Sequence, residues 1–477
     1  MADISAARLA ELVGLPAGEG EPRYSVLATR IRMLVADGRL AVGIRLPAER
    51  ELASVLRLSR ATVSAAYRRL RAQGWAGARQ GAGTWTSLPA GPAPSGAWGP
   101  APPEAGVLDL AHAAPAAPPE IAASFAAALA ELPRFLPGHG YYPAGLPELR
   151  ARIAERYSKR GLPSTADQVL VTAGALHAIT IALEVLVGPG DRVLVEHPSY
   201  PNALDAIRAT GARTVPVALD ASDPGALAPD VARAARQTSP RLAYLMPDFQ
   251  NPTGTLLDGR QRGALAAGLH SPGTVALVDE TFVELGLDAV PAPPYAAFAR
   301  ADRVVTVGTV SKTFWGGLRV GWIRAEAGLV QRMTAAAMRT QLSGPVLEQL
   351  ATCQLLDAAD GVLPAHRDRL RAQRDGLVAA LAAALPRWRV PVPVGGLVLW
   401  CGLPAPVSNA LVAAAERRGL RLAAGSRFGT GHAFADRLRL PYTQPIDVLR
   451  RAVGILAEFA DTVPPHDSGA LAARLVV

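Results

Sequence analysis

Short runs of apolar and β-branched residues alternate with amphipathic helical segments over most of the chain after residue 106. Such runs are typical of buried strands, and the segments between them have the spacing of helices packed on a sheet. Strands that alternate with helices form a largely parallel sheet, because each helix carries the chain back to the same edge. The sequence therefore predicts an α/β domain, with a smaller α+β lobe in the last hundred residues. The predicted strands lie at 169–172, 192–196, 214–219, 242–246, 275–278, 304–307 and 397–400.

Residues 88–106 separate this domain from the front of the chain. The segment contains six prolines with glycine and alanine and almost no charge, so it cannot form a core and is predicted to be a linker. A chain of 477 residues also exceeds what one core usually holds. We therefore expect four parts, which are an N-terminal extension at 1–22, a first domain at 23–87, the linker, and a second domain at 107–477.

The excess positive charge lies in the first domain. The chain has a net charge of +9, and residues 23–87 hold twelve arginines against three acidic residues, so the remainder is neutral. A small domain that carries the whole excess charge favours a polyanionic partner.

The same domain has the pattern of two helices joined by a short turn and followed by a hairpin. One predicted helix begins at Pro47, and Ser59 is a good N-cap for the next. Two short strands around a glycine-rich turn complete a winged helix-turn-helix pattern. Ser59, Arg60 and Thr62 would then lie at an exposed helix start, where an arginine can pair with guanine through two hydrogen bonds. The alternative is a small helical protein-interaction domain with a solvated basic face.

The first domain resembles the DNA-binding domain of GntR-family transcription regulators. The resemblance rests on the segments 46–53, 59–63 and 81–85 and covers the whole domain. It implies double-stranded operator DNA as a partner. The residues it implies at the DNA are Arg50, Ser59, Arg60, Thr62 and Gly81.

A single lysine, Lys312, follows the predicted strand at 304–307. Lys159 is the only other lysine, whereas the chain uses arginine for its remaining positive side chains. A lysine in a partly dry pocket at a strand end has a lowered pKa, and its neutral amine is a nucleophile toward an aldehyde. Thr309 could donate to a phosphate and Arg319 could pair with it. A solvated lysine in a loop is the ordinary alternative.

Four further groups stand at predicted strand ends, where an open α/β sheet places its ligands. One strand runs through Gly174 into a helix N-terminus, whose amides can bind a phosphate. Tyr200 offers a ring, Asn251 an amide, and Asp279 a carboxylate at the tip of a buried strand. Singly, each has an ordinary interpretation as a turn, a core side chain or a helix cap. Together with Lys312 they are the groups that pyridoxal 5′-phosphate requires.

This ordered set, with the spacing from Lys312 to Arg319, resembles fold-type I aminotransferases of the aspartate aminotransferase class over residues 107–460. The whole chain resembles the MocR/GabR subfamily of GntR regulators. That resemblance implies a pyridoxal-phosphate-dependent transferase fold of type I, and a homodimer in which a second subunit completes the cofactor pocket. The resemblance implies that Lys312 forms the Schiff base, that Asp279 pairs with the ring nitrogen, that Asn251 approaches the ring hydroxyl and that Tyr200 stacks on the ring. It implies that the cofactor phosphate is bound by Gly174, Ala175, Leu176, Thr309 and Arg319. It also implies that Tyr141 reaches the phosphate of the neighbouring subunit and that Arg439 binds a substrate or effector carboxylate.

Two positions depart from the family pattern. Many relatives have a tyrosine shortly after the buried aspartate, whereas this chain has Thr281 and Phe282 there and lacks the phenol. Leu176 stands where a polar residue is usual. The departures bear on efficient transamination more than on cofactor binding.

We therefore expect a transcription regulator that binds DNA through its first domain and senses an amine or amino acid at an aldimine site. An active aminotransferase with an appended DNA-binding domain is one alternative, and a sensor of pyridoxal phosphate that regulates vitamin B6 synthesis is another. Two cysteines exclude a disulfide framework and favour a reducing cytoplasm. We identify neither a signal peptide nor an apolar run of about twenty residues in the sequence.

Overall fold

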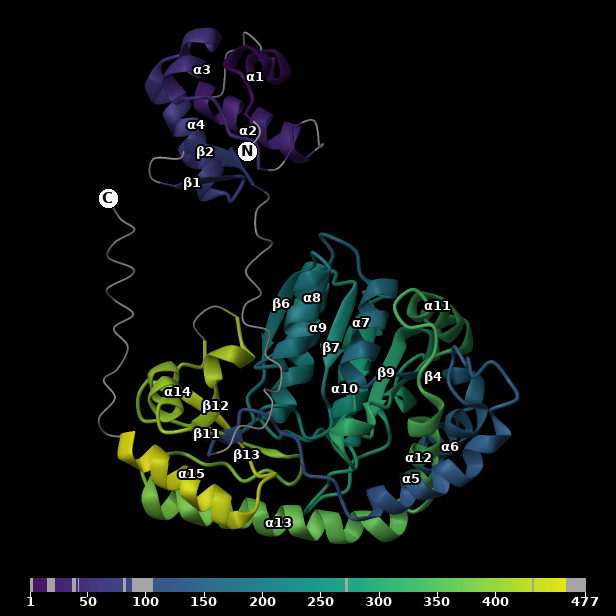
Figure 1. Ribbon diagram of the computed structural model, residues 1–477. Helices are drawn as coiled ribbons and strands as arrows, with labels where there is room; N and C mark the ends of the chain where they lie inside the picture. The colour runs from purple at the N-terminus through teal and green to yellow at the C-terminus, as the bar shows by residue number, and fades with distance from the viewer. Residues whose placement is uncertain are drawn as a thin grey trace. The chain divides into compact units, whose positions relative to one another are not determined.

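The computed structural model divides into two compact units, Met1–Gly99 and Pro100–Val477 (Figure 1). It describes residues 3–14, 22–36, 40–41, 43–79, 83–87, 106–270, 273–430 and 433–459.

The first unit packs four helices and a two-stranded antiparallel sheet around one core. The elements are α1 (Ala6–Val13), α2 (Arg23–Ala36), α3 (Glu49–Leu56), α4 (Arg60–Ala72), β1 (Ala76–Arg79) and β2 (Gly83–Thr86). Leu9 from α1, Ile31 from α2, Leu52 from α3 and Leu70 from α4 are fully buried in that core. Helix α1, which the sequence analysis assigned to an N-terminal extension, thus contributes to the core of the helical unit.

The second unit is built on a seven-stranded sheet of order β4-β10-β9-β8-β7-β5-β6 (Figure 1). Its neighbouring strands run parallel except at β10, which is antiparallel to both β4 and β9. The predicted α/β class with a parallel or mixed sheet is confirmed. The strands are β4 (Val169–Thr172), β5 (Arg192–His197), β6 (Arg213–Ala218), β7 (Leu242–Leu245), β8 (Val275–Asp279), β9 (Val304–Thr309) and β10 (Gly321–Arg324).

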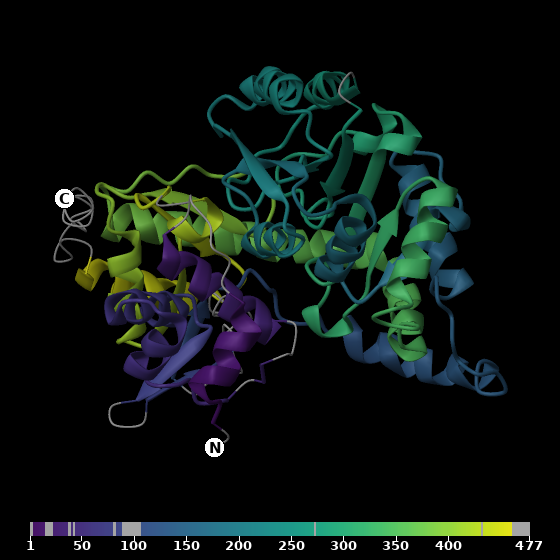
Figure 2. The same cartoon turned by 90° about the horizontal axis from the view of Figure 1, so that it is seen from above.

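Helices cover both faces of this sheet (Figure 2). Side chains of successive strand residues point to opposite faces, so Leu194 of β5 enters one core while Val193 and Val195 enter the other. One core contains α5 (Glu120–Glu131), α6 (Pro147–Lys159), α9 (Leu227–Thr238), α10 (Gly259–His270) and α12 (Val346–Asp357). The other contains α7 (Ala175–Leu186), α8 (Pro201–Ala209) and α11 (Ala327–Ala337).

The smaller lobe has a four-stranded sheet of order β11-β13-β12-β3. Its strands are β3 (Leu108–Leu110), β11 (Val398–Gly402), β12 (Leu420–Ala424) and β13 (Arg437–Pro441), and its helices are α14 (Ser408–Glu416) and α15 (Ile446–Phe459). The long helix α13 (Ala359–Ala384) runs along α15 at the base of the unit (Figure 1). Strand β3 lies just beyond the predicted linker and pairs parallel with β12, so the chain enters the second unit through the small lobe. Every helix in the described parts of the chain is too short or too polar to cross a membrane.

Candidate active site and DNA-binding surface

Asp279 ends β8 at the carboxyl edge of the large sheet and is almost fully buried. Its Oδ1 accepts a hydrogen bond from the backbone N–H of Thr281 at 2.9 Å, and its Oδ2 accepts one from the Tyr244 hydroxyl at 2.7 Å. Burial raises the pKa of Asp279, whereas these hydrogen bonds and the charge of Lys312 oppose that rise. Both carboxylate oxygens are therefore held in a fixed orientation.

Lys312 lies in the loop after β9, the neighbour of β8, and is half-buried. Its Nζ donates a hydrogen bond to the carbonyl oxygen of Ala113 at 2.8 Å. Burial lowers the pKa of Lys312 to about 8; the charges of Arg439 and Arg319 act in the same direction, and Asp279 opposes them. At pH 7 about one molecule in ten would carry a neutral amine here, against fewer than about one in a thousand for an unperturbed lysine.

Arg439 reaches the same group from β13 of the small lobe and is 1% exposed. Its Nη1 donates to Oδ1 of Asn251 at 3.3 Å, and its Nη2 donates to the carbonyl oxygen of Ala111. The guanidinium carbon stands 4.8 Å from the centre of the Phe428 ring. Burial lowers the pKa of Arg439 to about 9. Arg439 therefore links the turn after β7 to the chain segment after β3.

The Arg319 guanidinium and the N-terminus of α7 lie next to each other where the sequence predicts a phosphate site. Gly174 caps α7 with φ +91°, and a Cβ at this position would lie 3.1 Å from Nη2 of Arg319. Arg319 itself has a left-handed φ of 52° and donates to the Ala173 carbonyl at 2.7 Å. Glycine therefore leaves space between the first amides of α7 and the guanidinium, as a small anion requires.

The Thr309 hydroxyl, also predicted at the phosphate, is directed into the protein. It donates to the carbonyl of Val320 at 2.7 Å and lies 3.1 Å from the Ser311 hydroxyl. Because threonine has one hydroxyl hydrogen, Ser311 is the better placed donor to an anion. Ala175 and Leu176 begin α7, and the Leu176 side chain is 37% exposed.

The structure places the two predicted tyrosines differently. Tyr200 precedes α8, and burial followed by the charge of Asp279 raises its pKa to about 12, so it belongs to the group around Asp279. Tyr141 is 56% exposed and stacks on His139, with 5.6 Å between ring centres. Within the described residues, no hydrogen bond or ring contact joins Tyr141 to the other site residues of its own chain.

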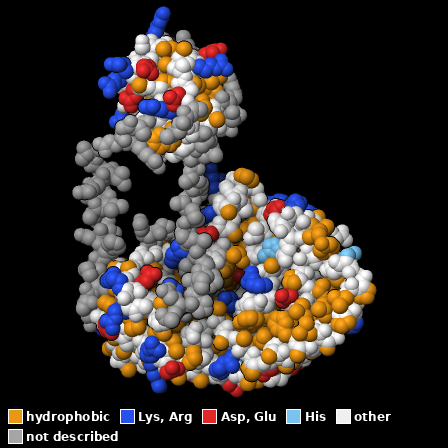
Figure 3. Space-filling view, viewed as in Figure 1, with side chains coloured by type: hydrophobic (Ala, Val, Ile, Leu, Met, Phe, Trp, Pro, Cys, Tyr) orange, Lys and Arg blue, Asp and Glu red, His pale blue; other side chains and the backbone are white. Residues whose placement is uncertain are grey.

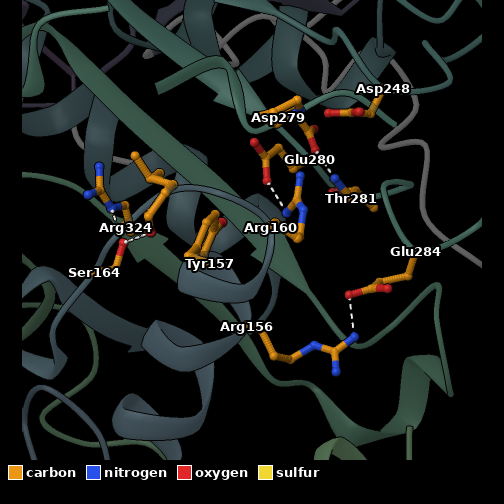
Figure 4. A network of polar contacts seen from close by, with 12 residues as sticks. Arg156, Tyr157, Arg160, Ser164, Asp248, Asp279, Glu280, Thr281, Glu284 and Arg324 are labelled. Atoms are coloured by element: carbon orange, nitrogen blue, oxygen red, sulfur yellow. Dashed lines mark hydrogen bonds and ion pairs between the residues drawn. The ribbon is translucent and has the colours of Figure 1, made fainter. Parts of the chain in front are cut away.

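Glu280, the neighbour of Asp279, contacts Arg160 in the polar network of Figure 4, which also includes Asp279 and Thr281. Its carboxylate pairs with Arg160 of the turn after α6 at 2.7 Å, so this acidic side chain is already engaged by a cation. Thr281 and Phe282 follow. The Thr281 hydroxyl is buried without a hydrogen-bond partner in the described structure, and Phe282 packs in the core of the small lobe.

Two parts of the site were missed from the sequence. Tyr244 is fully buried in β7 and contacts Asp279, and its only signal was a hydroxyl-bearing residue in an apolar run. Residues 111–113, which we call the strap, supply the carbonyl groups that accept from Lys312 and Arg439. Nothing local in the sequence indicates these carbonyl groups, since any residue type carries one.

Three of the predicted DNA-contacting residues, Ser59, Arg60 and Thr62, lie at the start of α4. The Ser59 hydroxyl accepts the backbone N–H of Thr62 at 3.0 Å and so caps the helix. The Arg60 side chain is 76% exposed, and Arg50 is exposed on α3. Gly81 lies outside the described residues. The unit therefore presents one exposed arginine in the first turn of α4 and another on α3.

Comparison with known proteins gives two family matches and several relatives. Residues 116–456 match the aminotransferase class I and II family, and residues 23–85 match the gntR family of bacterial regulatory proteins. The uncharacterized HTH-type transcriptional regulator YdcR of Escherichia coli is 29% identical over 453 residues, covering 87% of this chain and 94% of the relative. The 2-aminoadipate transaminase of Thermus thermophilus is 30% identical over 317 residues, or 65% of this chain and 76% of the relative.

Among solved structures, LysN, the α-aminoadipate aminotransferase of Thermus thermophilus, superposes with a TM-score of 0.69. It is 28% identical, and the match covers 77% of this chain and 94% of that one. The fold-type I assignment of the second unit is thereby confirmed. The chain belongs to the aminotransferase class I and II family and carries a gntR-type DNA-binding domain at its front, which is the architecture of MocR-like transcription regulators.

Proposed function

We propose that the chain is a pyridoxal-phosphate-dependent transcription regulator that senses an amine or amino acid at the site around Lys312 and Arg439. The observation that carries this proposal is the strap. Lys312 and Arg439 donate to the carbonyl oxygens of Ala113 and Ala111, and these residues directly follow β3, next to the predicted linker. A ligand that binds both cations would therefore break these hydrogen bonds and release the segment that leads to the DNA-binding unit.

The side chains present suit pyridoxal 5′-phosphate. Arg319 and the first amides of α7 fit a phosphate. The space between them is open because residue 174 is a glycine, whose missing Cβ would otherwise fill it. Asp279 fits a protonated ring nitrogen, because its carboxylate is buried and fixed. When bound, this cofactor supplies an aldehyde that condenses with primary amines and a ring that withdraws electrons. The chain offers the Lys312 amine to that aldehyde.

A ligand carboxylate is expected to compete with the strap for Arg439. A guanidinium binds a carboxylate through two parallel charge-assisted hydrogen bonds, which are stronger than a bond to a neutral carbonyl. Nη1 now donates to Asn251 and Nη2 to Ala111, so a carboxylate that binds both Nη atoms would replace these contacts. Binding of a carboxylate would thus free Ala111 and one end of the strap. The LysN structure contains N-(5′-phosphopyridoxyl)-L-leucine, which supports an amino acid as the ligand of this fold.

The test is DNA binding by the full chain loaded with cofactor and titrated with a panel of amines and amino acids. At least one compound should change both the visible absorbance of the cofactor and the affinity for operator DNA. Amine-induced spectral changes with constant DNA affinity across the panel would contradict the proposal.

A working aminotransferase is the second candidate, favoured by the similarity to transaminases. Steady-state turnover of an amino donor with a keto acid would support it, whereas a single turnover or none would support the regulator. A sensor of the cofactor itself is the third candidate. The Lys312 amine would have to break its hydrogen bond to Ala113 in order to react with an aldehyde. Addition of the cofactor alone would then change the DNA affinity of the cofactor-free protein.

We also infer a homodimer. Tyr141 is exposed and makes no contact with the other described site residues of its chain, as expected if it contacts the cofactor phosphate of a second copy. Leu129 and Leu136 are 55% and 67% exposed, and apolar side chains gather over α5 and its surroundings (Figure 3). Burial of such a patch against another copy would remove apolar surface from water.

Replacing Arg60 by alanine should weaken DNA binding by about 1–3 kcal/mol and relax the sequence preference, if this arginine contacts a base. Arg69→Ala is the matched control, because it removes an exposed arginine from the same helix about 13 Å further along. Fluorescence anisotropy with matched and altered operators at several salt concentrations measures both. Equal losses in the two variants, with no change in preference, would contradict a base contact at Arg60.

A further inference from the structure

We infer that Tyr244 is a positioning residue that keeps Asp279 ionised and correctly oriented for a positively charged ring nitrogen. The inference rests on the proposed cofactor function. Tyr244 lies within a buried strand, and its hydroxyl contacts the Asp279 carboxylate.

Tyr244 contacts Asp279 from the neighbouring strand. It lies on β7, which pairs parallel with β8, and its side chain is fully buried. The hydroxyl donates to Oδ2 of Asp279 at 2.7 Å. The pKa of Tyr244 is raised well above its usual value by burial and then by the charge of Asp279, so the proton stays on the tyrosine. Tyr244 therefore acts as a hydrogen-bond donor to an ionised carboxylate.

The carboxylate depends on this donor because its surroundings otherwise oppose the negative charge. Asp279 is 6% exposed, and in the described structure no arginine, lysine or histidine forms an ion pair with it. Glu196 and Tyr200 also face it, and the Glu196 carboxyl is itself buried, which raises its pKa to about 7. Lys312 is the cation that favours the ionised form, but its amine is the group expected to join the cofactor.

The two hydrogen bonds also fix the carboxylate plane. Oδ1 is held by the Thr281 backbone N–H, which no side-chain change removes, and Oδ2 is held by Tyr244. A protonated ring nitrogen would donate a hydrogen bond to one of these oxygens, so the orientation of the carboxylate matters. Without Tyr244, the carboxylate would lose the donor to Oδ2 and would take up a proton at higher pH.

The experiment compares wild type with Tyr244→Phe in the full chain, with pyridoxamine 5′-phosphate as the probe. This probe has no aldehyde and does not react with Lys312, so that its affinity reports the ring contacts. Affinity is measured from about pH 5 to about pH 9, so that the loss of affinity at low pH can be followed. The acidic limb of the affinity profile should move to higher pH by about one to two units in Tyr244→Phe, which is about 10- to 100-fold weaker binding on that limb.

Tyr295→Phe is the matched control, because Tyr295 is equally buried but packs in the core on the opposite face of the sheet. Its profile should follow wild type. In an Asp279→Asn background, Tyr244→Phe should produce no further pH shift. A loss by the same factor at every pH, or an unchanged profile, would overturn the inference while leaving the cofactor site in place. If wild type does not bind the probe at all, the proposed function fails and the inference fails with it.

Discussion

The Lys312→Ala variant is expected to lose the ligand response completely, so that saturating amine changes its DNA affinity by a factor of about one. The Lys312 amine interacts electrostatically with Asp279, and burial lowers its pKa to about 8. The chain has no substitute, since its other lysine, Lys159, is exposed at the end of α6 and pairs with Glu155 at 2.9 Å. The variant also loses the hydrogen bond to Ala113, which should shift its ligand-free DNA affinity toward the ligand-bound value.

Lys159→Ala is the control, because it removes the other lysine and leaves the strap contacts in place. It should respond to the ligand as wild type does. Anisotropy titrations of one operator fragment, with and without ligand, measure the ratio for each protein. A Lys312→Ala variant that retained the full wild-type response would eliminate the proposed sensing site.

The largest effect on stability is expected from Asp248→Ala, at about 3–5 kcal/mol of unfolding free energy. Arg262 of α10 and Asp248 form an ion pair at 2.6 Å in which both side chains are fully buried. Arg262 also donates to the carbonyl groups of Leu257 and Pro293, so it is tightly enclosed. Removing Asp248 would leave the buried Arg262 without the carboxylate that it pairs with, which is far costlier than losing one favourable contact.

Two comparisons isolate the cause. Asp205→Ala breaks an ion pair with Arg208 of the same 2.6 Å length, but both partners are about half exposed, so the cost should stay below about 1 kcal/mol. The double replacement Asp248→Leu with Arg262→Met removes both charges and should recover most of the lost stability. Urea unfolding of the cofactor-free chain measures all four proteins. A cost below about 1 kcal/mol for Asp248→Ala would show that the core accommodates the unpaired arginine.

The order of strands and helices in the second unit could be predicted because local pattern determines it. Each buried parallel strand appears as a short apolar run, and each helix on the sheet has an apolar stripe. Strand β10 was not among the predicted strands, and a four-residue run does not encode whether its neighbours are parallel. Strands β3, β12 and β13 were missed as well, and the three residues of β3 are too few to show a period.

Candidate site residues could be proposed from the sequence where a residue type at a strand end suggested its chemistry. Lys312, Asp279 and Asn251 carry reactive or polar groups in otherwise apolar surroundings, and parallel strands bring their ends to one edge. The contact of Tyr244 with Asp279 depends on the alignment of two strands, which the sequence does not reveal directly. The strap contacts join residues almost two hundred or more positions apart and use backbone oxygens. Such contacts leave no trace in residue identity.

The most direct measurement is to load the full chain with pyridoxal 5′-phosphate, reduce it with borohydride, and locate the added cofactor mass by peptide mass spectrometry. Reduction makes a bond between cofactor and lysine permanent, and the two lysines of the chain fall far apart in sequence. A coloured protein is expected, with the added mass at Lys312 and none at Lys159. A protein that retains no cofactor, or carries it at Lys159, would show that Lys312 is not the cofactor-binding amine.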